Sequence, residues 1–265
     1  MKSSERRMEI IRLATTSGLA SVEQLSTRFD VTPSTIRRDL AILTKAGKIA
    51  RTYGGAISLA PHPEATLRQR LGTAYAAKHA IGRWAAEQVR PGETVLLDAG
   101  TTTGAMAQEL SHRKGITVAT CGMTTLQALA EASGIELLVL GGRLRAVSQG
   151  LVGPLAESTL ARLTFDRAFM GADAVSVENG ICEADLEQTA LKEKMMQRSA
   201  EVYVLAHSEK LEQRPFHAWA IMPPRWTLVT DEDADPAVVQ RFRDRGVDVC
   251  LVAKTTSVSA EAAAG

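Results

Sequence analysis

Two stretches of the chain combine residue types that bind anions. Arg37 and Arg38 are adjacent in the segment TIRRDL, and a guanidinium group can donate two hydrogen bonds to a guanine edge or to phosphate. Further along, Gly100 and the three threonines 101–103 follow an apolar run, so backbone N–H groups and hydroxyls are concentrated at one point. The first stretch suits nucleic acid, and the second suits a phosphate group.

The arginine pair must lie on a helix to read a DNA groove. Thr32 and Pro33 form an N-cap and a first helical position, and the apolar residues of the segment then recur at helical spacing as far as Lys45. This pattern predicts a helix from Pro33 to about Lys45 with the arginines on its outward face, and such a helix fits the major groove. The residues expected at the DNA are Thr32, Ser34, Thr35, Arg37 and Arg38.

Neighbouring segments predict a winged helix-turn-helix around this helix. A first helix should end at Gly18, with Met8, Ile11, Leu13 and Ala14 as its apolar positions. A short second helix follows Ser21, and residues 48–57 form two strands around a glycine turn. This wing should carry Arg51 and Tyr53 towards backbone phosphates. An isolated arginine pair is most often a solvated helix surface, but the combination of cap, turn, helix and wing favours DNA binding.

Charge and composition agree with a chain of two parts. Residues 1–57 carry a net charge of +5 and the rest carries −4, so polyanion binding is confined to the N-terminal part. No apolar run reaches about 18 residues and the first residues are charged, which predicts a cytoplasmic protein. The three cysteines are widely spaced without a C-x-x-C pattern, so we expect no disulfide framework, no metal site and no cofactor.

The remainder of the chain alternates strands and helices, as an α/β domain with a largely parallel sheet does. We expect a DNA-binding domain at 1–57, a linker at 58–65, an α/β domain at 66–253 and a disordered tail at 254–265. The predicted strands are 94–97, 116–120, 136–140, 168–171, 202–206, 218–222, 226–229 and 247–252, and the predicted helices are 73–89, 104–111, 123–132, 155–162, 186–199 and 236–244.

Glycine and polar residues gather where these strands end, which is the edge at which parallel sheets bind ligands. The segment after the strand 94–97 matches neither the Walker pattern nor G-x-G-x-x-G, and alone it would most often be an ordinary turn. Four other segments at or just beyond strand ends, 141–143, 153–154, 171–173 and 208–210, favour a ligand site.

The N-terminal segment SVEQLSTRFDVTPSTIRRDLAILTKAGKIARTYGGA resembles the DNA-binding domain of the DeoR family of bacterial regulators. The remainder resembles that family's effector domain, which is similar in fold to ribose-5-phosphate isomerase and binds phosphorylated sugars. The resemblance implies an α/β protein with an N-terminal winged helix-turn-helix and a larger α/β effector domain. The residues that it implies for effector binding are Asp98, Gly100, Thr101, Thr102, Thr103, Gly171, Asp173, Lys192 and Lys210. Arg143 is added to them because the segment 141–143 lies at a strand end.

The sequence departs from the family pattern at three positions. Tyr53 stands where the family commonly has histidine, and Cys121 stands where it has asparagine. His207 replaces the aspartate of an Asp-Ser-x-Lys motif. His207 either contacts an unusual ligand or fills a strand end, and both possibilities stay open.

The resemblance implies a transcription regulator, a repressor of carbohydrate uptake or catabolism genes that binds operator DNA and a phosphorylated sugar. Two winged helices are usually paired by symmetry, which predicts a homodimer or homotetramer. The alternative is a sugar-phosphate isomerase with an appended nucleic-acid-binding module. The segment Met170-Gly171-Ala172-Asp173-Ala174 lacks the first Asp and the Glu of the isomerase motif, so we expect no enzyme.

Overall fold

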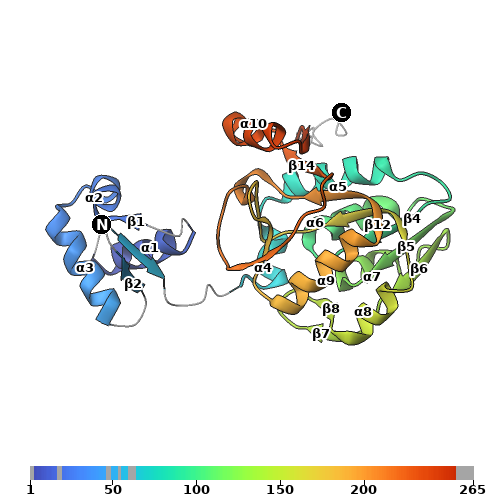
Figure 1. The fold of residues 1–265 in the computed structure, drawn as a ribbon, viewed down its shortest axis with the longest axis horizontal. Helices are drawn as coiled ribbons and strands as arrows, with labels where there is room; N and C mark the ends of the chain where they lie inside the picture. The colour runs from blue at the N-terminus through green and yellow to red at the C-terminus, as the bar shows by residue number, and fades with distance from the viewer. Residues whose placement is uncertain (1–2, 17–19, 46–48, 53–54, 59–63, 255–265) are drawn as a thin grey trace, which may run out of the picture. The chain divides into compact units, whose positions relative to one another are not determined.

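The computed structural model describes residues 3–16, 20–45, 49–52, 55–58 and 64–254 (Figure 1). These residues belong to two compact units, one formed by 1–64 with 213–217 and the other by 65–212 with 218–265. Tyr53, most of the predicted linker and residues 255–265 of the predicted tail lie outside the described residues. The predicted domain boundaries therefore stay predictions.

The small unit is a winged helix-turn-helix. Three helices, α1 (Ser3–Thr16), α2 (Val22–Phe29) and α3 (Pro33–Lys45), are joined by a three-stranded antiparallel sheet. The strands are β1 (Ala20–Ser21), β2 (Ile49–Thr52) and β3 (Gly55–Ser58), in the order β1-β3-β2. The core contains the buried residues Ile10, Leu25, Ile36, Leu40 and Leu43. The fold expected for the N-terminal segment is thus confirmed.

The predicted apolar stripe of α1 was wrong at Met8. This side chain is 72% exposed, whereas Ile10 is fully buried. Arg6 lies one helical turn before Ile10 and donates to the buried Asp39 of α3 at 2.7 Å, so the face turned to the core runs through Arg6 and Ile10. The prediction failed because it considered only apolar residues, so it could not place the buried Arg6 on the face turned to the core.

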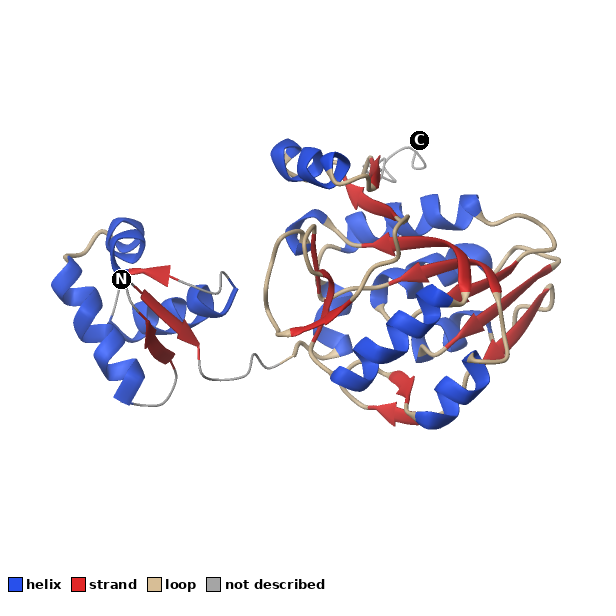
Figure 2. Cartoon of the chain, viewed as in Figure 1, coloured by secondary structure: helices blue, strands red, loops and turns tan. Residues whose placement is uncertain are grey.

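The large unit is built on a seven-stranded parallel sheet with the order β15-β14-β12-β9-β4-β5-β6 (Figure 2). Its strands are β4 (Thr94–Leu97), β5 (Ile116–Thr120), β6 (Ile135–Val139), β9 (Phe165–Met170), β12 (Ser199–Leu205), β14 (Thr227–Asp231) and β15 (Asp248–Val252). The helices are α4 (Leu67–Gly72), α5 (Tyr75–Gln88), α6 (Thr101–Leu110), α7 (Met123–Leu129), α8 (Pro154–Leu160), α9 (Leu186–Gln197) and α10 (Pro236–Asp244), with a 3-10 turn at Ser208–Lys210.

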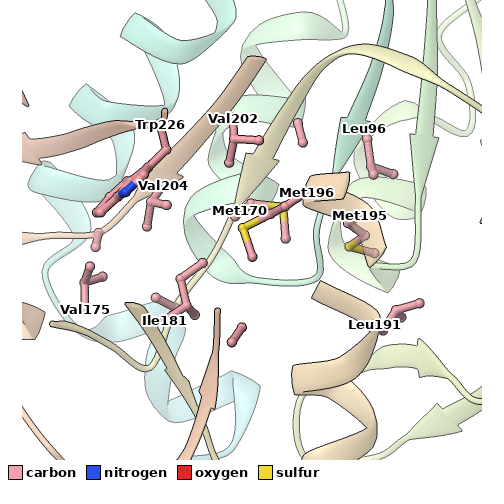
Figure 3. Close-up of a cluster of buried hydrophobic side chains, with 14 of the residues drawn as sticks. Leu96, Met170, Val175, Ile181, Leu191, Met195, Met196, Val202, Val204 and Trp226 are labelled. Atoms are coloured by element: carbon pink, nitrogen blue, oxygen red, sulfur yellow. The ribbon is translucent and has the colours of Figure 1, made fainter. Parts of the chain in front are cut away.

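Helices cover both faces of this sheet. On one face, α5, α6 and α7 form an apolar cluster with Val95, Leu97, Phe169, Leu205 and Val229. On the other face, α8, α9 and α10 pack in a second cluster that contains Leu96, Met170 and Val204, part of which Figure 3 shows. Alternating strand residues therefore point to opposite helical layers, which lets each strand end direct neighbouring side chains into different surroundings.

Two smaller sheets complete the unit. The strands β10 (Ala174–Ser176), β11 (Gly180–Glu183) and β13 (Ala218–Ala220) form an antiparallel sheet, and β7 (Arg143–Arg145) pairs with β8 (Gly150–Val152) as a hairpin. The predicted strand 218–222 thus lies outside the main sheet. Within the described ranges, no helix has the length and apolar character needed to span a bilayer. The same ranges contain no cluster of His, Cys, Asp and Glu suited to a metal ion.

Candidate DNA-binding and effector sites

Helix α3 presents two exposed arginines near its N-terminus. The Thr32 hydroxyl accepts a hydrogen bond from the Thr35 N–H at 3.3 Å and lies 2.8 Å from the Ser34 hydroxyl, so the start of α3 is capped as predicted. Arg37 and Arg38 are exposed on the next turn. Their neighbour Asp39 points the other way, into its ion pair with Arg6. The helix therefore keeps its acidic side chain in the core and its basic ones at the surface.

The wing is described only as backbone. Strands β2 and β3 pair in antiparallel register, with Arg51 opposite Ala56. The side chain of Arg51 and the whole of Tyr53 lie outside the described parts, so their contact with phosphate stays a prediction.

The loop after β4 places the N-terminus of α6 at the sheet edge. Gly100 is the N-cap of α6 and supplies no side chain, so no side chain caps the first turn of this helix. The hydroxyls of Thr103 and Thr124 donate to the Gly100 carbonyl at 3.2 and 2.8 Å, which holds that carbonyl in place. The Thr102 and Thr103 side chains are buried, so this stretch has backbone N–H groups and the half-buried Thr101 to offer an anion.

Asp98 and Lys192 form the centre of a buried network on the α9 face. The Lys192 ammonium donates to Asp98 Oδ2, to the Gly171 carbonyl at 2.8 Å and to Glu183 Oε1 at 2.9 Å. Asp98 also accepts from the N–H groups of Ala99 at 2.7 Å and Gly171 at 3.0 Å. An ammonium has three protons, and all three are used here.

This network changes the role we give to Asp98 and Lys192. Both were predicted as effector contacts, yet each side chain is only 1% exposed and fully engaged within the protein. They hold the segments that begin at Ala99 and Gly171 in place, so we regard them as positioning residues.

Burial raises the pKa of Glu183 to about 8, against the opposing effect of the Lys192 ammonium. Burial also raises the pKa of Cys121, 3.8 Å from Asp98, which keeps it a thiol.

Three cations lie nearer the edge of the sheet. Arg70 of α4 donates to Asp173 Oδ1 at 3.1 Å, the Lys78 ammonium of α5 donates to the Arg70 carbonyl, and the Lys210 ammonium donates to the Ala172 carbonyl. Within the described ranges, Asp173 Oδ2 is buried and has no hydrogen-bond partner. The structure thus brings together the predicted residues Asp173 and Lys210 with two residues that sequence reasoning missed.

The charges of these three cations affect one another. Burial, together with the charges of Lys210 and Arg70, lowers the pKa of Lys78 to about 8. Burial is also the main cause that lowers the pKa of Lys210, and the Arg70 and Lys192 charges add to it while Asp173 and Glu183 oppose it. An anion placed among them would relieve this repulsion.

His207 is buried at the end of β12, at 4% exposure, and lines a cavity of about 500 Å³. The cavity lies between the start of α5 and the ends of β12 and β14; its lining is Ala74, Tyr75, Ala76, Ala77, His207, Ser208, Glu209, Asp231, Asp233, Asp235 and Lys254. Burial and the nearby charges of Lys210 and Lys78 lower the pKa of His207 to about 3, so the ring is neutral near pH 7.

Arg143 is not brought to this group. Its side chain is exposed and forms an ion pair with Glu187 at the start of α9. The sequence contained signals for the two missed residues, Arg70 and Lys78. Thr66 and Gln69 form a capping box that marks the start of α4, the helix that carries Arg70. Lys78 is a charged residue within the apolar face of α5.

Comparisons with known proteins agree with this architecture. Residues 6–62 match the DeoR-like helix-turn-helix domain, and residues 73–232 match the DeoR C terminal sensor domain. The chain is 32% identical to the HTH-type transcriptional repressor GlcR of Bacillus subtilis, over 95% of this chain and 97% of that protein. It is 26% identical to the glycerol-3-phosphate regulon repressor of Escherichia coli, over 95% of this chain and all (100%) of that protein.

Among solved structures, ribose 5-phosphate isomerase A of Methanocaldococcus jannaschii is similar with a TM-score of 0.38 and 18% identity, over 51% of this chain and 53% of that one. This likeness is too weak to support an argument about activity. The two family matches cover most of the described chain, and the alignments with the two named regulators cover 97% and 100% of their lengths. The chain therefore belongs to the DeoR family of DNA-binding transcription regulators.

Proposed function

We propose that this regulator represses genes of carbohydrate uptake or catabolism in the cytoplasm and that a phosphorylated sugar, bound at the edge of the large unit's sheet, controls it. Relatives named as repressors, including one of a glycerol-3-phosphate regulon, support the biological setting. The observation that carries the ligand class is the pair Lys78 and Lys210, whose ammonium groups donate to backbone carbonyls. Carbonyls leave their charge unbalanced, and a phosphate dianion would balance it.

The surrounding groups suit a sugar phosphate. The strands β4, β9 and β12 are neighbours in the sheet, so the N-terminus of α6, Asp173 and Lys210 lie at three adjacent strand ends. A phosphate would accept hydrogen bonds from the ammonium groups and from the N–H groups at the start of α6. The free oxygen of Asp173 would accept one from a sugar hydroxyl, and Arg70 fixes that carboxylate. The Gly171 N–H donates to Asp98 at 3.0 Å, which ties this strand end to the end of β4.

Control by this ligand requires that it favour one of two arrangements of the protein on DNA. A tenfold change in operator affinity corresponds to about 1.4 kcal/mol, which one charge-assisted hydrogen bond made in only one arrangement can supply. We propose that the regulator acts as a homodimer or homotetramer, because paired winged helices read two half-sites. Sedimentation of the full chain tests that assembly.

Calorimetry of the full chain tests the ligand class. Glucose 6-phosphate, fructose 6-phosphate and glycerol 3-phosphate are compared with their unphosphorylated parents, and we expect binding to require the phosphate. Lys210→Met should weaken the tightest of these by about 10- to 100-fold, as loss of a charge-assisted hydrogen bond does. The control is Lys114→Met, an exposed lysine, which should bind like the wild type. Equal binding of parent sugars would contradict the proposal.

The enzyme alternative has a separate test. Turnover of ribose 5-phosphate that is lost in Asp173→Asn would show an isomerase and would overturn a purely regulatory role. We expect no turnover, because the Asp173 carboxylate is held by Arg70 and the isomerase motif around it is incomplete.

A further inference from the structure

The cavity at the start of α5 has a feature that the phosphate site does not use. His207 lines it, and within the described ranges the Nδ1 atom of His207 is buried without a hydrogen-bond partner. Leaving a buried polar atom unpaired costs stability, so such an atom needs a reason. Among the described histidines, His207 is the one that is buried.

His207 lies two residues beyond the end of β12, at the start of the 3-10 turn. It lines one cavity together with Ala74, Tyr75, Ala76 and Ala77 at the start of α5. Lys78 is the next residue of α5 after Ala77, and Lys210 follows His207 by three residues. The two cations therefore adjoin the segments that form the cavity wall, and the charges of both contribute to the lowered pKa of His207.

The cavity wall is apolar on the α5 side and polar on the side of β12 and β14. Asp231 accepts from the Ser208 N–H at 2.7 Å and from the Ser208 hydroxyl at 2.9 Å, which fixes the loop that carries His207. Glu209, Asp233 and Asp235 add carboxylates to the wall, with Asp233 in an ion pair with Lys254, and Tyr75 exposes an aromatic ring at the cavity. Carboxylates and an aromatic face suit the hydroxyl groups and the C–H face of a sugar. The volume of about 500 Å³ is within the usual range of small-molecule sites.

We infer that this cavity holds the hydroxylated carbon chain of the effector and that His207 is a specificity-determining residue, hydrogen-bonded to one of its hydroxyls while Lys78 and Lys210 hold the phosphate. This inference rests on the proposed function and adds the orientation of the ligand. A neutral imidazole can donate to or accept from a hydroxyl without adding charge beside the two lysines. Rotation of the ring about χ2 exchanges its two edges, so either nitrogen can serve.

Selectivity, measured by calorimetry on the full chain, tests the inference. We measure the Kd of methyl phosphate, which has no hydroxyl, and the Kd of four sugar phosphates: ribose 5-phosphate, glucose 6-phosphate, fructose 6-phosphate and glycerol 3-phosphate. The selectivity ratio is the Kd of methyl phosphate divided by the Kd of the tightest-binding sugar phosphate. In His207→Phe this ratio should fall by about tenfold, as loss of one hydrogen bond in a buried site does, with the Kd of methyl phosphate unchanged. His207→Asn imitates Nδ1 and His207→Gln imitates Nε2, and one of them should restore the ratio.

The outcomes separate this inference from the proposed function. An unchanged ratio in His207→Phe, or an equal loss for methyl phosphate, would overturn the inference and leave the phosphate site intact. If wild type binds no phosphorylated compound, the proposed function fails and the inference fails with it. Thermal unfolding checks each variant; should His207→Phe not fold, equal ratios in the Asn variant, the Gln variant and wild type overturn the inference. His112→Phe, at an exposed histidine, is the matched control and should keep the wild-type ratio.

Discussion

Removing the Lys192 ammonium should destabilise the large unit strongly. Lys192→Met keeps the unbranched side chain and deletes the charge that Asp98 and Glu183 share. The three side chains are 1 to 3% exposed, so water cannot replace the lost partner. Breaking a buried ion pair by removing one member costs about 3–5 kcal/mol. Since domains are stable by about 5–15 kcal/mol, this loss is a large share of the whole.

Urea unfolding monitored by tryptophan fluorescence measures this loss in one unit. All three tryptophans, Trp84, Trp219 and Trp226, belong to the large unit, so the signal reports that unit alone. The matched control is Lys194→Met on the same helix, whose ion pair with Glu157 is exposed and should contribute at most about 1 kcal/mol.

The pH dependence of Lys192→Met provides a second reading. Burial raises the pKa of Glu183 and the Lys192 charge opposes that rise, so without the ammonium the folded state binds more protons than the unfolded state over a wider pH range. Stability of the variant should therefore recover as the pH is lowered towards the ordinary carboxyl range. Equal, small losses in Lys192→Met and Lys194→Met, with no such recovery, would refute the reasoning that the network is a buried charge pair.

Three further predictions follow from the charges of the molecule. The pKa of Lys78 is lowered to about 8, and a bound phosphate would raise it. Affinity for a phosphorylated sugar should therefore fall as the pH rises past 8, because the free protein then loses the Lys78 proton. Calorimetry of Lys78→Arg should show an affinity that depends less on pH. Because the folded pKa of Glu183 is raised to about 8, the free energy of unfolding should decline between about pH 4.5 and 8, and urea titrations of Glu183→Gln should show less decline. Arg37→Ala should weaken operator binding by about 1–3 kcal/mol and relax base preference in gel-shift assays, while Arg83→Ala, at an exposed arginine of the large unit, should do neither.

The elements of the fold were largely predictable because each has a local signal. The helix from Pro33 was recognisable from its hydroxyl cap and proline, and the strand 94–97 from an apolar run that ends in glycine and threonines. The hairpins β7/β8 and β10/β11 were missed. Their strands have only three or four residues each, and pairing of such short strands depends on what packs against them rather than on their own pattern.

The candidate site was predictable in place but not in the roles of its residues. The order of strands and helices along the sequence shows which residues follow a strand. That position at a strand end identified Gly100, Asp173 and Lys210 as candidates. Whether a charged group is free for a ligand depends on its partner, which comes from a distant part of the chain: Asp98 and Lys192 are 94 residues apart. No local pattern records such a pairing.

The same reasoning explains why we propose Lys78, and not Lys192, as a ligand group. Both are lysines with almost no exposed surface, at 3% and 1%. Lys192 donates to the carboxyl groups of Asp98 and Glu183, and its raised pKa reflects that stabilisation. Among the described residues, Lys78 donates to a carbonyl and has two cationic neighbours, and burial and these charges lower its pKa. A protein that keeps such a charge buried gives up stability in the free state, and an anionic ligand returns that stability on binding. The sign of the pKa shift thus distinguishes Lys192, which holds segments of the site in place, from Lys78, to which we propose that an anionic ligand binds.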